Sequence, residues 1–214
     1  CDHVQVIRIG TKVPAFNPFR ILNDPSLLEM FKTYSTNEKK IYVMAHFNHP
    51  RELTPEAIEG LNLLMKSGVS LVNQTPLVKG VNDDPEVLAE LFSKLSYIGV
   101  PPYYVFLCRP TLGNETYSVP IERGYEIFEK SRTLCSGLAK RARLVMSHES
   151  GKIEVLGMSE DQIFFKFLRA ANKTDNARFL AFFRNPEACW FDDYQEASDE
   201  FSLFSQTTVK AGCP

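Results

Sequence analysis

Features that would place a protein in a membrane, in a secretory pathway or on nucleic acid are missing from this sequence. No apolar run is long enough to span a bilayer, and no signal peptide is visible. The 214 residues carry a formal net charge of -2, so no excess of basic side chains attracts nucleic acid or an anionic membrane. We therefore expect a cytoplasmic protein with no membrane and no nucleic-acid partner.

Cysteine is scarce, and no two cysteines have the spacing of a metal clip. The five are odd in number and scattered, at Cys1, Cys108, Cys135, Cys189 and Cys213. Free thiols in a reducing compartment are the simplest interpretation. Because 44% of the residues are hydrophobic, the chain can bury a core that needs no disulfide or metal for stability.

The sequence also lacks an initiating methionine and any lead-in before its first strand-like segment. Natural domains rarely begin in this way, so we expect a fragment of a longer protein. Its length suits one medium domain, or one domain with an appendage.

Short apolar runs alternate with amphipathic stretches over most of the chain. This alternation predicts parallel strands with helices outside them, and the nearly continuous apolar strands predict that both faces of the sheet are covered. Asp24, Thr54 and Asp84 each precede a proline at an expected helix start. An open doubly wound sheet and part of a (β/α) barrel both fit, but no Gly-rich phosphate loop follows the first strand. The expected strands are residues 4–9, 41–45, 69–72, 100–107 and 142–146, and the expected helices are residues 25–34, 55–67, 85–97 and 121–135.

The pattern changes after residue 152. Two aromatic-rich segments, residues 163–170 and 178–183, flank a polar turn, which predicts an appended β-hairpin. The expected fold class is therefore α/β, a partial (β/α) barrel of parallel strands with outer helices plus a C-terminal β-hairpin extension. We place the barrel portion at residues 1–156, the hairpin at 157–190 and a poorly ordered tail at 191–214.

Polar and ionisable residues gather where the expected strands end. Barrel proteins place their chemistry at this rim, where strands pass into the following loops. The rim residues are Gly10, Thr11 and Lys12; His46, Phe47, Asn48, His49 and Pro50; Asn73, Gln74 and Thr75; Cys108, Arg109 and Pro110; and Ser147, His148, Glu149 and Lys152.

Each rim residue also has a structural interpretation. His46 and His49 form an H-x-x-H pair, which is a weak zinc signal without a third ligand, so we expect no metal site within this chain. The alternatives for the others are backbone capping by Asn73 and Gln74, an ion pair of Arg109 with Glu115, and a solvated Lys152.

Four segments share the order and spacing of the motifs of one family. Residues 46–54 (HFNHPRELT) are similar to HFNHPxE(I/L)T, and residues 68–83 (GVSLVNQTPLVKGVND) to GVPLxNQxxLLxGVND. Residues 8–14 resemble RIGxxxPV, and residues 102–108 resemble the PYYxxxC part of PYYxxxCD. These motifs belong to the lysine 2,3-aminomutases, a family of radical S-adenosylmethionine (SAM) enzymes. The chain is thus identified as a carboxy-terminal portion of a family member.

The resemblance implies a cofactor set and a catalytic lysine. In the family a three-cysteine motif, expected outside this chain, binds a [4Fe-4S] cluster that cleaves SAM to a radical. The radical starts the migration of an amino group on an amino acid bound to pyridoxal 5'-phosphate (PLP). Lys152 falls where the family has its PLP lysine, while His46, Asn73 and Gln74 align with the SAM and PLP site. A partly dry barrel mouth would lower the pKa of Lys152, and Gly151 would let the backbone approach the cofactor.

Two substrate positions depart from the family pattern. Lysine-specific members have Asp after the Cys of the fourth strand and another Asp after the fifth, where this chain has Arg109 and Ser147. A guanidinium repels an ammonium and suits a carboxylate. We therefore expect a small-molecule amino acid substrate other than free lysine, such as acidic glutamate. The loop before Lys152 is shortened, which leaves the retention of PLP open, and a homo-oligomer is an additional expectation.

Two other functions remain open. A Schiff-base lyase or aldolase could use Lys152 without radicals, and a CxxxCxxC motif upstream would exclude it. A degenerate or truncated family member could instead bind a ligand or partner. The chain by itself is expected to be inactive, because no cluster forms without its three thiolates. The aromatic residues that could serve as an interaction surface, although paired strands more often bury them, are Phe164, Phe165, Phe167, Phe179, Phe182, Phe183 and Trp190.

Overall fold

A computed structural model of the chain describes residues 3–195, which form one eight-stranded sheet with helices packed against it. The strands lie in the order of the sequence, β1 to β8. The first five are parallel, and the last three continue the sheet in antiparallel fashion. The strands are β1 (Val6–Thr11), β2 (Lys40–Ala45), β3 (Ser70–Leu77), β4 (Pro102–Leu107), β5 (Arg143–His148), β6 (Gly151–Met158), β7 (Gln162–Ala170) and β8 (Phe179–Phe183).

The longer helices begin where the caps predicted them. Asp24 accepts a hydrogen bond from the amide of Leu27, and Thr54 and Asp84 cap their helices in the same manner. The helices are α1 (Val13–Phe16), α2 (Phe19–Leu22), α3 (Pro25–Tyr34), α4 (Pro55–Lys66), α5 (Pro85–Tyr97) and α6 (Ile121–Thr133). Short 3-10 turns are η1 (Pro50–Glu52), η2 (Glu115–Tyr117), η3 (Gly137–Arg141), η4 (Lys173–Asp175) and η5 (Phe191–Asp193).

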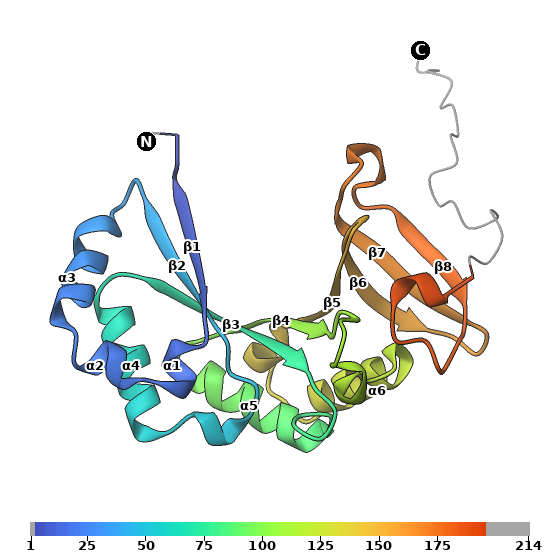
Figure 1. Ribbon diagram of the computed structural model, residues 1–214, viewed down its shortest axis with the longest axis horizontal. Coiled ribbons are helices and arrows are strands. Elements are labelled where there is room, and N and C mark those ends of the chain that lie inside the picture. The colour runs from blue at the N-terminus through green and yellow to red at the C-terminus, as the bar shows by residue number, and fades with distance from the viewer. Residues whose placement is uncertain (1–2, 196–214) are drawn as a thin grey trace, which may run out of the picture.

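Helices cover one face of the parallel strands, which corrects the expectation that both faces are covered. Figure 1 shows the sheet bent into an arc with the helices on its outer side. Along β3, Leu71, Asn73, Thr75 and Leu77 are buried while the residues between them are partly exposed. This alternation is the mark of a sheet with one covered face. We call the uncovered face the concave face.

The covered face carries the core in two clusters. One joins β2 and β3 to α2, α3 and α4, and it includes the fully buried Leu61. The other joins β4, β5, β6 and β7 to α5 and α6, and it includes Phe92 and Phe165. Because the second cluster spans parallel and antiparallel strands, the two kinds of strand share one hydrophobic core.

The predicted hairpin is confirmed as β7 paired with β8, but strand β6 was not predicted. Ser147 pairs with Lys152 and His148 with Gly151, so β5 turns back directly into β6. The predicted boundary after residue 156 therefore falls inside a continuous strand. A Gly-containing, mixed-polarity segment between two better-marked elements carries only a weak strand signal, which explains why β6 was missed.

The start of the predicted tail is packed rather than loose. Phe191 contacts Phe165 and Phe182 at ring-centroid distances of 5.4 and 5.2 Å, and Tyr194 is buried. Residues 196–214 of that tail lie outside the described residues. Of the hairpin aromatics, Phe165, Phe167 and Phe182 are buried core residues, whereas Phe183 is exposed.

The sheet is open within residues 3–195, where β1 pairs with β2 alone. Val6, Ile7 and Ile9 of β1 are exposed, so this strand presents both an unpaired edge and apolar side chains. The parallel part is thus a curved open sheet, and its place in a barrel remains a prediction. In the same range no helix is both long and apolar enough to cross a bilayer.

Candidate functional site

The amine of Lys152 lies on the concave face against two aromatic rings. Its Nζ is 4.3 Å from the ring centroid of Tyr104 and 4.9 Å from that of Phe106. Burial lowers the pKa of Lys152, and the Arg8 guanidinium on β1 lowers it further. The two rings attract an ammonium and so act in the opposite sense. The structure thereby presents a partly buried amine that is neutral more often than a solvated lysine.

Lys152 follows a glycine whose place depends on the neighbouring strand. Gly151 has a φ of 143°, and a Cβ there would collide with the carbonyl oxygen of Arg169 and lie 2.8 Å from Cα of Ala170. The close approach expected for Gly151 is therefore to the backbone of β7. A register shift between Lys152 and Ile153 marks an irregularity next to the amine, a device that re-aims side chains.

Tyr104 stays protonated over the ordinary pH range. Burial and the hydrogen bond with Tyr103 raise its pKa to about 12. The two rings are tilted at 42° with centroids 3.9 Å apart. Glu154, whose pKa is raised by burial, lies 3.6 Å from Arg143 and carries a further carboxyl group to this region. The two rings next to the Lys152 amine are therefore uncharged, and the charged residues of this region are Glu154 and Arg143.

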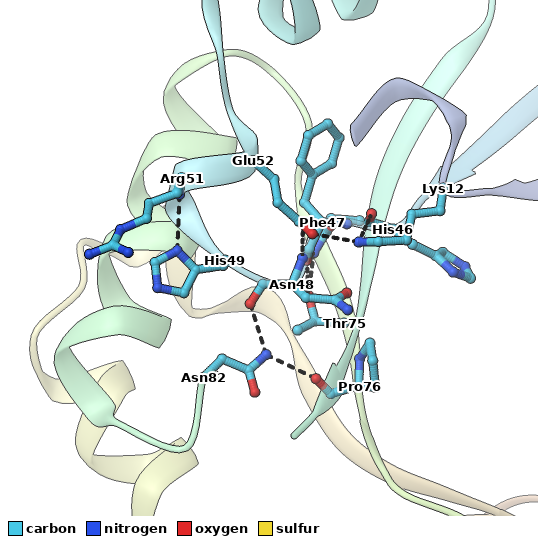
Figure 2. A network of polar contacts seen from close by, with 11 residues as sticks. Lys12, His46, Phe47, Asn48, His49, Arg51, Glu52, Thr75, Pro76 and Asn82 are labelled. Atoms are coloured by element: carbon cyan, nitrogen blue, oxygen red, sulfur yellow. Dashed lines mark hydrogen bonds and ion pairs between the residues drawn. The ribbon is translucent and has the colours of Figure 1, made fainter. Parts of the chain in front are cut away.

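His46 and Gln74 meet where β2 ends beside β3. His46 Nε2 is 3.3 Å from Gln74 Oε1, and a Cβ on Gly10 would stand 4.0 Å from the same imidazole nitrogen. Figure 2 shows the ring of His46 turned away from the polar contacts of its own loop. These two side chains are thus available to a ligand on the concave face.

Asn73 does not share that face, although it was expected to lie beside Gln74 in the site. It is inside β3, 1% exposed, and points to the covered side. Its Oδ1 accepts from the amide of Phe47 at 2.9 Å, and its Nδ2 donates to Thr75 Oγ1 at 2.6 Å. Asn73 therefore bonds to the backbone of Phe47 rather than capping the end of its own strand, and it lies on the face opposite to Gln74 because side chains alternate along a strand.

A second polar network fixes the loop after β2 (Figure 2). Glu52 joins Lys12 Nζ at 2.7 Å through Oε1 and accepts from the amide of Asn48 at 2.6 Å through Oε2. The fully buried Asn82 donates to the carbonyl oxygens of Asn48 and Pro76, both at 2.9 Å. Sequence reasoning missed the roles of Glu52 and Asn82, although both lie within the motifs. The loop that carries His46 is thus tied to Lys12 after β1 and to Asn82 after β3.

The H-x-x-H pair does not form a metal site. His49 Nδ1 accepts from the amide of Arg51 at 3.1 Å and caps η1. Among residues 3–195 no group of three or more His, Cys, Asp or Glu side chains could hold a metal ion. The described residues therefore offer no set of ligands for an iron–sulfur cluster.

Glu115, the alternative partner considered for Arg109, accepts instead from the amide of Gly113. Arg109 lines a cavity of about 250 Å³ at the ends of β4 and β5. That cavity holds two carboxylates beside the guanidinium. The other lining residues are Pro110, His148, Glu149, Trp190 and Asp192.

Ser147 is exposed and pairs directly with Lys152 across β5 and β6. Side chains of directly paired residues point to the same face, so Ser147 stands beside the lysine amine. A larger cavity of about 510 Å³ opens over β1 to β4, lined by Arg8, Tyr42 and Met44 among others. The concave face therefore combines an amine, polar groups and space.

The candidate site is thus a partly buried lysine on the uncovered face of an open α/β sheet whose first five strands are parallel. No protein-family model matches the chain. Curated relatives do. The chain is 56% identical over 93% of its length to a putative L-lysine 2,3-aminomutase of Aquifex aeolicus, covering 54% of that protein. It is 42% identical over 63% of its length to the L-lysine 2,3-aminomutase of Clostridium subterminale, covering 31%. It is 34% identical over 70% to the glutamate 2,3-aminomutase of Clostridioides difficile, covering 34%.

The chain belongs to the lysine 2,3-aminomutase family. It spans about half the length of the first of these relatives and about a third of the others. Among solved structures, a radical SAM methyltransferase from Sphaerobacter thermophilus is similar with a TM-score of 0.46 and 18% identity, over 66% of this chain and 40% of that one. That likeness is too low to add to the family assignment.

Proposed function

We propose that the protein containing this chain is a radical SAM, PLP-dependent amino acid 2,3-aminomutase, and hence an isomerase. The observation that carries the proposal is the amine of Lys152, partly buried on the concave face with a lowered pKa. A lysine attacks a cofactor carbonyl only as the neutral amine, so burial prepares it for covalent attachment. The names of the relatives support the reaction class.

PLP fits the residues that are present. Lys152 would hold it covalently, Tyr104 and Phe106 would pack beside it, and Ser147 lies next to the attachment point. When bound, PLP supplies a conjugated system that delocalises an unpaired electron during migration of the amino group. The chain itself supplies the positioned amine and walls that restrict water. His46 and Gln74 are proposed to contact SAM or PLP, while the [4Fe-4S] cluster would be ligated outside this chain.

The substrate is proposed to be an amino acid other than free lysine, with an acidic amino acid as first candidate. Arg109 carries a guanidinium into the cavity at the ends of β4 and β5, where it can receive a carboxylate. Glu149 and Asp192 line the same cavity, and they suit the ammonium of a zwitterion. Relatives named for lysine and for glutamate are both similar to the chain, so their names do not choose between the substrates.

A Schiff-base reaction without radicals is the second candidate, because the same lysine geometry supports it. Both functions need Lys152, whereas only the radical reaction needs SAM. Location in the cytoplasm and self-association are further parts of the proposal, and they rest on the sequence.

The test uses the complete natural protein that contains this chain. It is supplied with PLP, a reductant and single amino acids, with and without SAM, and the β-amino acid is measured. We expect the β-amino acid from the wild type only when SAM is present, none from Lys152→Arg, and normal yields from the control Lys166→Arg on β7. A β-amino acid formed by Lys152→Arg would contradict the proposal. Amine chemistry that needs no SAM would favour the second candidate.

A further inference from the structure

His148 ties the segment after β8 to the turn that precedes Lys152. Its side chain is 6% exposed and packs near the rings of Trp190 and Phe191, with centroid distances of 5.8 and 5.4 Å. Nε2 is 3.0 Å from Oδ2 of Asp192, which is 44 residues away in sequence. Nδ1 is 2.7 Å from Ser150 Oγ and accepts from the amide of Ser150 at 3.1 Å.

These contacts define the tautomer of the ring. A backbone amide only donates, so Nδ1 must be the unprotonated nitrogen that accepts from Ser150. Nε2 then carries the hydrogen and donates it to the carboxylate of Asp192. Asp192 thereby fixes both the orientation of the ring and the nitrogen that faces the turn. A carboxylate with this role holds a histidine in one tautomer.

The clamped turn leads straight to the lysine. His148 pairs with Gly151, and the next pair outward on the hairpin is Ser147 with Lys152. The carbonyl of Ser150 accepts from the amide of Ala171, so the turn is also held by β7. Any rotation of the turn would move Lys152 relative to the ring of Tyr104, which lies 4.3 Å from its Nζ.

We propose that His148 is a positioning residue that, oriented by Asp192, holds the β5–β6 turn and so sets the placement of the Lys152 amine. This proposal rests on the proposed function, because that function gives the Lys152 amine its chemical role. His148 does not touch the reacting amine. The charged and titratable groups around Lys152 are Arg8 on β1, Tyr104 on β4 and Arg169 on β7, and none of them is changed in the variants below.

Two substitutions test the contacts of the two His148 ring nitrogens separately. His148→Asn places an amide oxygen near the position of Nδ1, which can still accept from Ser150 but does not reach Asp192. His148→Gln reaches toward Asp192 but loses the acceptor at the turn. Asp192→Ala removes the orienting carboxylate. Asp175→Ala is the matched control, since Asp175 is a carboxylate on η4 that pairs with Arg178 at 4.0 Å.

The readout is competitive labelling of amines with acetic anhydride in the complete protein without PLP, followed over pH at the peptide that contains Lys152. We expect His148→Gln to raise the midpoint by about half a pH unit, a fall of about threefold in neutral amine near pH 7. His148→Asn should stay near the wild type. Asp192→Ala should raise the midpoint in the wild-type background but not in the His148→Asn background, and Asp175→Ala should change nothing.

A wild-type midpoint in both His148→Gln and Asp192→Ala overturns the positioning role. An equal effect of Asp192→Ala in both backgrounds overturns it too, because the carboxylate would then act without the ring. PLP and borohydride added to the wild type test the proposed function separately. If no adduct forms on Lys152, that function fails, while the labelling comparison still decides the role of His148.

Discussion

The parallel strands β1 to β5 and the antiparallel strands β6 to β8 are held together by different kinds of contact. In the parallel part each of the three capped helices begins with a side chain that bonds to an amide two or three residues further on. In the antiparallel part the decisive bonds are distant, such as Arg184 to Glu122 across 62 residues and His148 to Asp192 across 44. Lys152 stands at the junction, so its position depends on both.

The difference teaches where sequence patterns have predictive power. Caps and 3.6-residue periods are local, and the bounds of α3 and α5 agree with their predictions. Contacts between residues far apart in the sequence leave no local sequence pattern. The contact between Asp192 and His148, which holds the turn before Lys152, therefore could not be predicted.

The largest expected effect comes from a substitution at Gly151, where the start of β6 packs closely against β7. Gly151→Ala adds a Cβ at a φ of 143° that collides with the Arg169 carbonyl oxygen of β7, so we expect a loss of at least about 4 kcal/mol of unfolding free energy. Gly113→Ala is the control, because Gly113 also has a positive φ, of 87°, but nothing lies within 4 Å of its Cβ position. It should cost only about 1–2 kcal/mol. Urea unfolding measures both, and equal losses would show that the contact with β7 is unimportant.

The next effect concerns the docking of the antiparallel part on α6. The carboxylate of Glu122 is 3% exposed, accepts from Nε and Nη2 of Arg184 at 2.9 Å each, and accepts from the amide of Asn185 at 2.7 Å. Glu122→Gln leaves the guanidinium without its counter-charge, and we expect a loss of about 2–3 kcal/mol. The control Glu126→Gln breaks an exposed pair with Arg123 and should cost less than about 1 kcal/mol.

Hydrogen exchange would locate the Glu122 effect. Faster exchange at the amides of β8 and η5 in Glu122→Gln, with little change in β1 to β3, is the expected pattern. A uniform increase in exchange rate over the whole sheet would mean that strands β1 to β5 and strands β6 to β8 unfold as one unit. Their different kinds of contact would then give them no difference in stability.

Substrate preference tests the role of Arg109 in the cavity at the ends of β4 and β5. Arg109→Asp removes the guanidinium and should lower kcat/KM for an acidic amino acid relative to lysine by about tenfold or more, or about 1.4 kcal/mol. Lys79→Asp makes the same charge change outside the residues that line this cavity and serves as the control. The ratio of the two kcat/KM values is the measurement, and an unchanged ratio in Arg109→Asp would remove Arg109 from the substrate site.

The smallest effect concerns the charge of Lys152. Since burial lowers its pKa, the unfolded chain binds this proton more tightly than the folded chain does. The cost of burying the charged amine is fully present below the pKa of Lys152 in the folded protein. It disappears as the pH rises to the pKa of an ordinary, solvated lysine. Lys152→Met should therefore stabilise the protein at pH 7 by a few tenths of a kcal/mol more than at pH 11, a small value because the amine is partly exposed. Thermal unfolding at the two pH values measures it, and a pH-independent gain would contradict a buried charge.

The candidate site was predicted in part. Ser147 and Lys152, which were predicted at the same rim, lie side by side across β5 and β6. The face on which Asn73 lies could not be predicted, because β3 continues through Gln74 and Thr75 to Leu77, beyond the expected end at residue 72. Polar residues and Pro76 concealed those strand positions. The side chains of Asn73 and Thr75 bond to Phe47 in the loop after β2, and the Pro76 carbonyl accepts from Asn82.

The account depends most directly on Lys152 as the residue that binds PLP. The complete natural protein would be incubated with PLP, reduced with borohydride, digested and mapped by mass spectrometry. The account predicts a pyridoxyl group on Lys152 and its loss in Lys152→Arg but not in Lys166→Arg. An adduct on another lysine, or none on a protein that cleaves SAM, would contradict the aminomutase proposal and leave a family member that uses its concave face for other chemistry.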